Sequence, residues 1–229
     1  MKKTIIIIFT SVLFFVSLVI IFDHKIISFY ISKNLSKAIG QKTVIDSIST
    51  NYDEGLIIFN EFKILNTNAF SSKYIFEADQ ILININLKSI FSNLVIINSI
   101  KILNPKLFIE IKESNDKEKK SIQDNINIVE KIKESKEKKI YPKKSKDKNF
   151  FISKTDIKNF KVHIKYPYNL EKYDIKLSDI ILSNIGNTNK ESKYESQHYK
   201  DAFKLIYRDI YLRITDQRLR AYIKKHYKL

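Results

Sequence analysis

The sequence contains no cysteine, which excludes disulfide bonds, thiolate catalysis and cysteine-ligated zinc sites. This absence does not identify the compartment, because cytosolic and exported proteins can both lack cysteine. Only three glycines are present, Gly40, Gly55 and Gly186, and their wide spacing forms no glycine-rich loop that cradles phosphate. A disulfide scaffold and a phosphate loop are therefore both excluded.

Catalytic patterns are also missing. The four histidines are dispersed, and no pair has the i, i+4 spacing that would let two imidazoles bind one metal ion. The G-x-S-x-G elbow and the serine–lysine signature do not occur, and no carboxylates form a recognisable acid–base pair. His163 is expected to be a solvated strand histidine, on the side shared with Lys161 and Lys165. We predict a protein that is not an enzyme and that binds no cofactor or metal.

Arginine is scarce, although lysine and arginine together number 41 and the formal net charge is +16. Codon bias in an AT-rich genome explains most of the lysines, because side chains selected for phosphate geometry are more often arginine. The alternative is a positive field that attracts anionic phospholipid headgroups or nucleic acid. We expect no nucleic-acid binding, because the aromatic residues fall at core spacing and do not form stacking platforms between basic residues.

The run from Ile5 to Phe22 contains no charged residue. A helix of this length, at about 1.5 Å per residue, spans nearly the whole hydrocarbon core of about 30 Å. The alternative is a cleavable signal peptide, but its hydrophobic region is usually shorter and no A-x-A-like cleavage site follows here. We predict a membrane anchor over residues 1–25. Its membrane-embedded side chains include Ile5, Phe9, Leu13, Val16, Ile20 and Phe22.

Helical spacing of apolar residues after this run, with Gly40 as a stop, predicts a helical stalk over residues 26–42. Residues 43–112 carry strand patterns and predict a first β-meander, with a turn at Gly55 and a second turn at Asn104-Pro105. Two alternating rows in this meander form an apolar face. They are Ile81, Ile83 and Ile85, and Leu107, Ile109 and Ile111. This face is either the lining of a lipid groove or an ordinary core beneath the C-terminal helix.

Residues 113–148 are rich in lysine and acidic residues and poor in large apolar ones. Such a segment cannot bury enough surface to offset its chain entropy, so we predict a charged mobile loop, with a phosphate-binding arm as the alternative. Alternation returns over residues 149–187 and predicts a second β-meander. Apolar residues every three or four positions predict an amphipathic C-terminal helix over residues 195–229.

The order of elements in the first meander carries a family resemblance. Glu77-Ala78-Asp79 leads into an alternating strand, then into the short segment LKSIFSNL, and then into VIINSIKILNPKLFIEI. This order resembles the repeating unit of AsmA-like proteins of the bacterial envelope, in which strand, short helix, strand, proline turn and strand follow one N-terminal membrane helix. The resemblance implies a curved sheet whose concave apolar face shelters acyl chains.

The expected fold is α+β, with a single N-terminal transmembrane helix, a curved antiparallel sheet of about seven to nine strands and a C-terminal amphipathic helix. The resemblance implies a non-enzymatic, single-pass protein of the bacterial inner membrane with the bulk of its chain in the periplasm. Its expected function is membrane biogenesis or phospholipid transport, and its expected partners are the membrane, phospholipid acyl chains and other envelope proteins. The alternative is an anchored scaffold that binds a protein through its sheet edge or charged loop.

Overall fold

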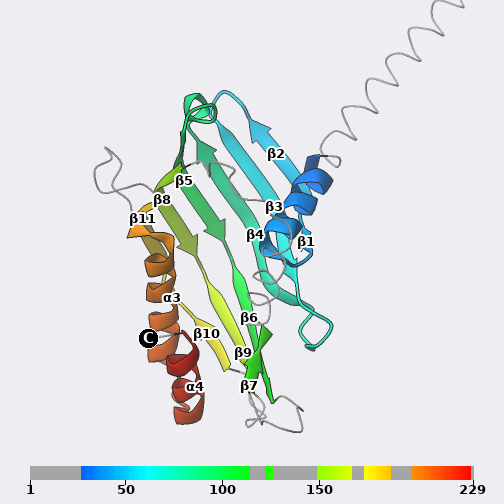
Figure 1. Cartoon of the computed structure of the whole chain (residues 1–229), viewed down its shortest axis with the longest axis vertical. Coiled ribbons are helices and arrows are strands. Elements are labelled where there is room, and N and C mark those ends of the chain that lie inside the picture. Colours follow the sequence, from blue (N-terminus) through cyan, green and yellow to red (C-terminus); the bar gives the residue numbers. More distant parts are fainter. Residues whose placement is uncertain (1–26, 114–121, 126–148, 167–172, 187–196, 228–229) are drawn as a thin grey trace, which may run out of the picture.

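The computed structural model describes residues 27–113, 122–125, 149–166, 173–186 and 197–227. In these residues most of the backbone forms one curved, open sheet, which confirms an α+β fold (Figure 1). The described strands are β1 (Thr43–Val44), β2 (Ser47–Asn51), β3 (Leu56–Leu65), β4 (Tyr74–Ile85), β5 (Leu94–Leu103), β6 (Lys106–Glu113), β7 (Ile122–Asp124), β8 (Asn149–Lys158), β9 (Lys161–Lys165), β10 (Tyr173–Lys176), β11 (Ile180–Gly186) and β12 (Gln197–His198).

The predicted C-terminal helix is present, but as two helices. They are α3 (Tyr199–Arg213) and α4 (Gln217–Tyr227). The break follows from Asp216, whose carboxylate accepts a hydrogen bond from the Leu219 backbone N–H at 2.8 Å and so caps the start of α4. Ile214, in the break, is buried and keeps the two helices on a common core.

The predicted stalk is a helix over residues 27–39. Gly40 ends it as expected, with a φ of 83° and a backbone hydrogen bond of 3.0 Å to the Ser36 carbonyl. The helix is not a free stalk, however. Its apolar side packs against the sheet through Ile27, Ile31 and Leu35.

The Asn104-Pro105 pair does not form a turn, so the prediction of a meander at this point is wrong. β4 pairs with both β5 and β6. Gln80 is opposite Leu103 in β5, and Phe76, four residues before Gln80, is opposite Leu107 in β6, four residues after Leu103. The register is therefore unbroken, and the pair is a bend within one long strand. Asn104 has a φ of 52°, in the left-handed region that asparagine tolerates better than most residues.

The neighbouring strands bend at the same level. β8 and β9 follow β5 and β6 in one parallel register, and β11 and β10 follow β8 and β9 in one antiparallel register. Asn159, between β8 and β9, has a φ of 56°. Its amide donates to Asn104 Oδ1 at 3.1 Å, and the Asn104 amide donates to Asp79 Oδ2 at 2.8 Å. These three side chains form a polar ladder across the bend.

The bend shifts the alternation of side chains by one residue. In a regular strand only residues an even number of positions apart share a face. Nevertheless Ile102 before the bend and Leu107 after it pack against the same core cluster, and so do Ile157 and Val162 on the adjacent strand. Without this shift, one half of each strand would turn its apolar row to the opposite face.

The sheet is mixed, and the prediction of a wholly antiparallel sheet is wrong. β5 lies parallel to β8, and β6 lies parallel to β9. Parallel neighbours cannot be joined by a hairpin, because the chain must first cross back along the sheet. The charged segment between β6 and β8 is long enough for this crossover.

Part of that charged segment belongs to the fold, which corrects the expectation of a loop throughout residues 113–148. β7 pairs with the end of β6. Asn125, directly after β7, is fully buried; its side chain accepts from the Glu110 backbone N–H at 3.0 Å and donates to the Phe108 carbonyl at 2.8 Å. The rest of the predicted loop lies outside the described residues.

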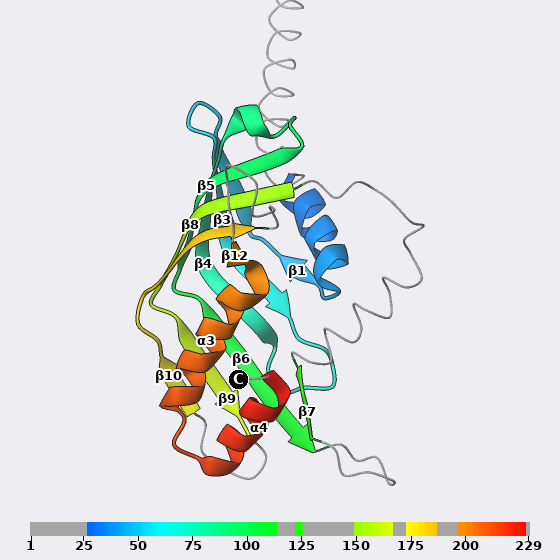
Figure 2. The same ribbon diagram turned by 60° about the vertical axis from the view of Figure 1, so that its left-hand side comes forward.

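The core forms two clusters on one face of the sheet. The larger one joins β6, β8, β9 and β10 to α3 and α4, and the smaller one joins β2, β3 and β4 to the helix over residues 27–39. Ile81 packs on the smaller cluster and its cross-strand partner Ile102 on the larger one, so both clusters lie on the same face. We call this the concave face; Figure 2 shows the longer helices on it.

Ile109 provides a test of the larger cluster. Its side chain is 2% exposed among α3 and β9 residues, so Ile109→Asp buries an unpaired carboxylate. We expect a loss of several kcal/mol, comparable to the whole stability of a domain, and an unfolded protein by circular dichroism. Ile109→Val is the size control and should cost only about 1 kcal/mol. An Ile109→Asp protein that melts like the wild type would contradict this packing.

Candidate functional site

Apolar side chains form continuous rows across the concave face, from strand to strand. Each row follows from the pairing register, because directly opposed residues share a face. The first row is Ile48, Phe59, Ile81, Ile102, Ile157 and Ile180. The second contains Ile57, Ile83, Ile100 and Leu182 with Thr50 and Thr155, and the third contains Ile85, Ile97, Ile152 and Ile185. We call these three rows the central apolar face.

Among the described residues, helices cover only the two sides of the central apolar face. Its two sides belong to the two core clusters, under the helix over residues 27–39 and under α3. Between them, Ile83, Ile85, Ile97 and Ile100 belong to neither cluster and are half-buried. A strip of branched apolar side chains is therefore left partly open to solvent in the middle of the sheet.

The structure separates the two rows that the sequence suggested as groove or core. Ile109 and Ile111 are buried in the larger cluster, and Leu107 packs half-buried against it. Ile81 packs against the smaller cluster, whereas Ile83 and Ile85 lie in the open strip.

Sequence patterns did not identify the remaining residues of the strip. Ile97 and Ile100 stand in an apolar run that already indicated a strand. What the sequence could not supply is the register that places these residues beside Ile83 and Ile85.

The predicted anchor residues, Ile5, Phe9, Leu13, Val16, Ile20 and Phe22, lie outside the described residues. Within the described part of the chain, no helix has the length and apolar character needed to cross a membrane.

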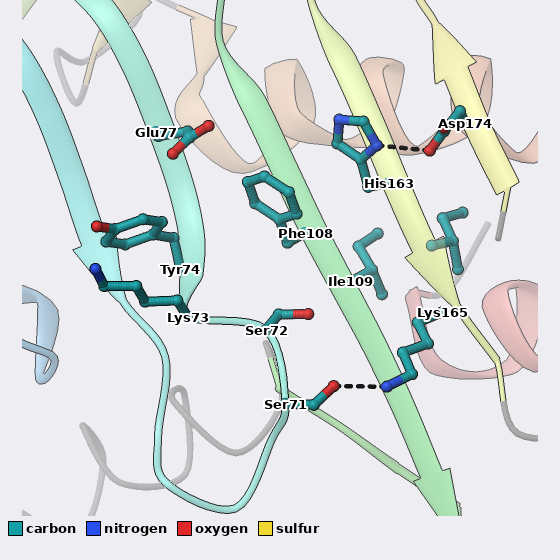
Figure 3. Close-up of a pocket in the computed structure, with 11 residues that line it drawn as sticks. Ser71, Ser72, Lys73, Tyr74, Glu77, Phe108, Ile109, His163, Lys165 and Asp174 are labelled. Carbon is teal, nitrogen blue, oxygen red and sulfur yellow. Dashed lines mark hydrogen bonds and ion pairs between the residues drawn. The ribbon is translucent and has the colours of Figure 1, made fainter.

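The opposite, convex face carries a polar hollow of about 610 Å³ (Figure 3). Phe108 and His163, opposite each other on β6 and β9, stack with ring centroids 4.9 Å apart. Asp174 on β10 lies 2.6 Å from His163 Nδ1. Lys73, Tyr74 and Glu77 from the start of β4 line the other side.

His163 shares this face with Lys161 and Lys165 as predicted, but it is not simply solvated. Its side chain is 32% exposed and is held on both sides, by Phe108 and by Asp174. No local sequence pattern indicates this pair, because Asp174 stands in a different strand. No group of three metal-ligating side chains occurs among the residues that the structure describes.

The hydroxyl groups beside the hollow are already engaged. The Ser71 and Ser72 hydroxyls both donate to Glu110 Oε2, at 3.0 and 2.9 Å, and Lys165 Nζ donates to Ser71 Oγ at 2.6 Å. Both hydroxyl protons are thus directed at the Glu110 carboxylate, and the ammonium group of Lys165 lies beside the Ser71 oxygen.

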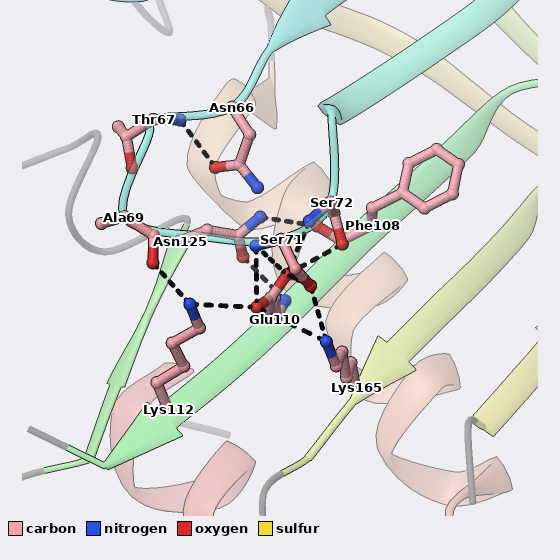
Figure 4. A network of polar contacts seen from close by, with 10 residues as sticks. All are labelled: Asn66, Thr67, Ala69, Ser71, Ser72, Phe108, Glu110, Lys112, Asn125 and Lys165. Carbon is pink, nitrogen blue, oxygen red and sulfur yellow. Dashed lines mark hydrogen bonds and ion pairs between the residues drawn. The ribbon is translucent and has the colours of Figure 1, made fainter.

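Glu110 is the centre of this network (Figure 4). It is 1% exposed, and its carboxylate also accepts hydrogen bonds from the backbone N–H groups of Ser71 and Ser72, at 3.0 and 2.8 Å. Lys112 lies 3.4 Å from the carboxylate and donates to the Ala69 carbonyl. The network thus attaches the loop between β3 and β4 to the middle of β6.

These contacts keep Glu110 ionised. Burial by itself raises the pKa of the Glu110 carboxyl, but the hydrogen bonds from the backbone N–H groups and hydroxyls of Ser71 and Ser72 outweigh it. The net effect lowers the pKa from 4.5 to about 2. A carboxylate with this role stabilises the fold and is not suited to accept protons at neutral pH.

The chain matches no protein-family model, and it matches no curated protein. The interpretation of the site therefore depends on its geometry and on the sequence pattern.

The lowered pKa of Glu110 predicts that the free energy of unfolding decreases at acid pH. Because its folded pKa is below its unfolded one, its contribution is complete above pH 4.5 and is lost as the pH falls toward 2. At about 1.4 kcal/mol per pKa unit, the contribution is roughly 3 kcal/mol. We expect Glu110→Gln to destabilise the protein at pH 7 and to flatten the dependence of the unfolding free energy on pH, measured by urea denaturation between pH 3 and 7.

The control for this experiment is Glu54→Gln, which removes the same charge at an exposed turn. It should leave the urea midpoint at pH 7 nearly unchanged. Equal effects of the two substitutions would show that net charge, and not the Glu110 network, sets the acid sensitivity.

Proposed function

We propose that the protein is an AsmA-like, non-enzymatic envelope protein, anchored in the bacterial inner membrane, that shelters phospholipid acyl chains in membrane biogenesis or phospholipid transport. The observation that carries this proposal is the central apolar face, whose middle strip is half-buried between two helix-covered clusters. An acyl chain on this strip would take the place of water against isoleucine side chains. Each buried methylene contributes about 0.8 kcal/mol, so even part of one chain gives useful affinity.

The dimensions of the face fit this role. It crosses β2, β3, β4, β5, β8 and β11 in order. With neighbouring strands about 4.8 Å apart, five spacings give a width of roughly 24 Å. One leaflet of a bilayer contributes about half of a 30 Å hydrocarbon core, so the width of the central apolar face is comparable to the length of an acyl chain. The width is too small to bridge two membranes, so transport over that distance requires partners or an oligomer.

The convex face also supports this proposal, because it is suited to contact water while the concave face contacts lipid. It carries cross-strand ion pairs such as Lys106–Glu77 at 2.9 Å, together with the His163–Asp174 pair. Polar groups of this kind keep one face in water, while the concave face offers the apolar surface.

A scaffold function is the second candidate, because the sheet has an open edge. Among the described residues, β2 pairs only with β3, and its residues Ser49, Thr50 and Asn51 are exposed. An extended segment of a partner protein can add to such an edge through backbone hydrogen bonds.

The proposed topology places residues after Asp23 in the periplasm, with Ile5 to Phe22 as the anchor. We expect a reporter that is active only in the cytoplasm to be silent when fused after Leu229, with the fusion recovered in the membrane fraction. Strong reporter activity would place the domain on the cytoplasmic side. A soluble mature protein that begins after Ser28 would exclude the anchor.

Two adjacent residues of β4 test the lipid proposal. Ile83 lies on the central apolar face and Leu82 on the opposite face, and both are half-buried. We expect Ile83→Asp to remain folded, because water reaches the carboxylate when lipid is absent, and to lose co-purifying phospholipid as measured by mass spectrometry. Leu82→Asp is the matched control and should retain the lipid.

Circular dichroism on the same samples separates unfolding from loss of ligand. A folded Ile83→Asp protein with the wild-type amount of lipid, or a wild-type protein that carries none, would contradict the lipid function. Unfolding of Ile83→Asp alone would show that the strip is an ordinary core.

A further inference from the structure

The exposed aromatic side chains gather at one end of the sheet. Eight large apolar side chains are strongly exposed among the described residues, and five of them lie at this end. They are Phe29, Tyr30, Tyr52, Leu87 and Phe91, which we call the aromatic end. The set includes all four exposed aromatic residues of the described chain, and Phe91 is 93% exposed.

The elements that carry these side chains are neighbours. Phe29 and Tyr30 lie in the first turn of the helix over residues 27–39, Tyr52 lies in the turn between β2 and β3, and Leu87 and Phe91 lie in and just after the 3-10 helix η1 (Leu87–Ser89). Both views place the start of that helix, the β2–β3 turn and η1 at the same end of the sheet (Figures 1 and 2).

The β2–β3 turn is held directly against η1. Gly55 has a φ of 63°, and its carbonyl accepts from the Ile85 N–H at 2.8 Å. A Cβ atom at Gly55 would lie 2.2 Å from the Ile85 carbonyl oxygen and 3.3 Å from Leu87 Cγ, so only glycine allows this approach. The Asn84 amide adds a hydrogen bond of 2.9 Å to the Glu54 carbonyl.

Hydrogen bonds hold the loop that carries Phe91. Asn86 caps η1 by accepting from the Lys88 N–H at 3.1 Å. Ser89 is buried; its hydroxyl donates to the Asn86 carbonyl at 2.6 Å and accepts from the Ile96 N–H at 2.8 Å. The loop that presents Phe91 is thus fixed to β5, and the ring is directed outward without a protein contact to account for its position.

We propose that the aromatic end lies in the interface of the bilayer, with Phe91 and Leu87 among the upper acyl chains and the tyrosines at headgroup level. This inference rests on the proposed membrane anchor. Phe22, the last residue of the apolar run, is five residues from Ile27, and five extended residues span at most about 18 Å. An anchored run therefore holds the aromatic end close to the membrane surface.

The chemistry of the aromatic end fits an interface better than water. Phenylalanine and tyrosine rings are enriched where a membrane meets water, because each ring offers an apolar body and tyrosine adds a polar tip. Among the described residues, the exposed charges nearby are Lys33, Lys88, Asp53 and Glu54. Their mixed sign gives no electrostatic attraction to anionic lipid, so apolar burial drives the contact and a zwitterionic bilayer is sufficient.

The chain contains no tryptophan, so Phe91→Trp introduces a single fluorophore at this end. We expect the full-length protein in phosphatidylcholine vesicles to show blue-shifted emission. Vesicles with brominated acyl chains should remove roughly half of its intensity, because an interfacial ring lies within reach of the bromine atoms. Leu212→Trp is the matched control: Leu212 is 60% exposed near the end of α3, far from η1, and its emission should be unaffected by bromination.

Flotation of the same vesicles separates this inference from the anchor. A protein that floats with the vesicles while Phe91→Trp is not quenched overturns the inference and leaves the anchor intact. A protein that does not float overturns both. Equal quenching of the two tryptophans overturns the proposed orientation, and a concentration-dependent blue shift without quenching shows that Phe91 contacts another protein or a second copy of the chain.

Discussion

The backbone register of the long strands continues without interruption through the bend marked by Asn104 and Asn159, and the rest of the molecule depends on this continuity. The bend changes the alternation of side chains by one residue, but the pairing register between neighbouring strands is the same on both sides of it. Apolar residues from both halves of each strand therefore reach the concave face. A slip of one residue in any pair would move a whole apolar row to the polar face and remove the surface on which three helices pack.

The two faces of the sheet are consequently unequal, and this asymmetry explains how the site arises. On the convex face, the buried Glu110 carboxylate is satisfied by hydrogen bonds within the protein. The concave face needs an apolar cover, and the helices provide it only at the two sides. Within the part of the chain that the structure describes, the strip around Ile83 and Ile100 is the part of this face that these helices leave uncovered.

The sequence predicted local features well and long-range pairing poorly. The strands, the stop at Gly40 and the turn at Gly55 follow from alternation and from glycine conformations, and the structure confirms them. The bend at Asn104-Pro105 was mistaken for a turn, because proline and asparagine favour both and only the partner strand decides between them. The parallel pairing, the buried Asn125 and the His163–Asp174 pair were missed for the same reason: each joins residues whose proximity no local pattern records.

The parallel pairing of β5 with β8 also governs the order in which the molecule can assemble. Leu94 is paired with Asn149, so fifty-five residues must be added to the chain before the β5 edge receives its neighbour. Until then β3, β4, β5 and β6 can associate through nearby pairings, but they present an unpaired edge together with an uncovered apolar surface. Contacts between such distant residues form slowly, because the intervening chain must first be ordered. The first half of the protein therefore passes through a stage with an unpaired strand edge, which makes that stage vulnerable to aggregation.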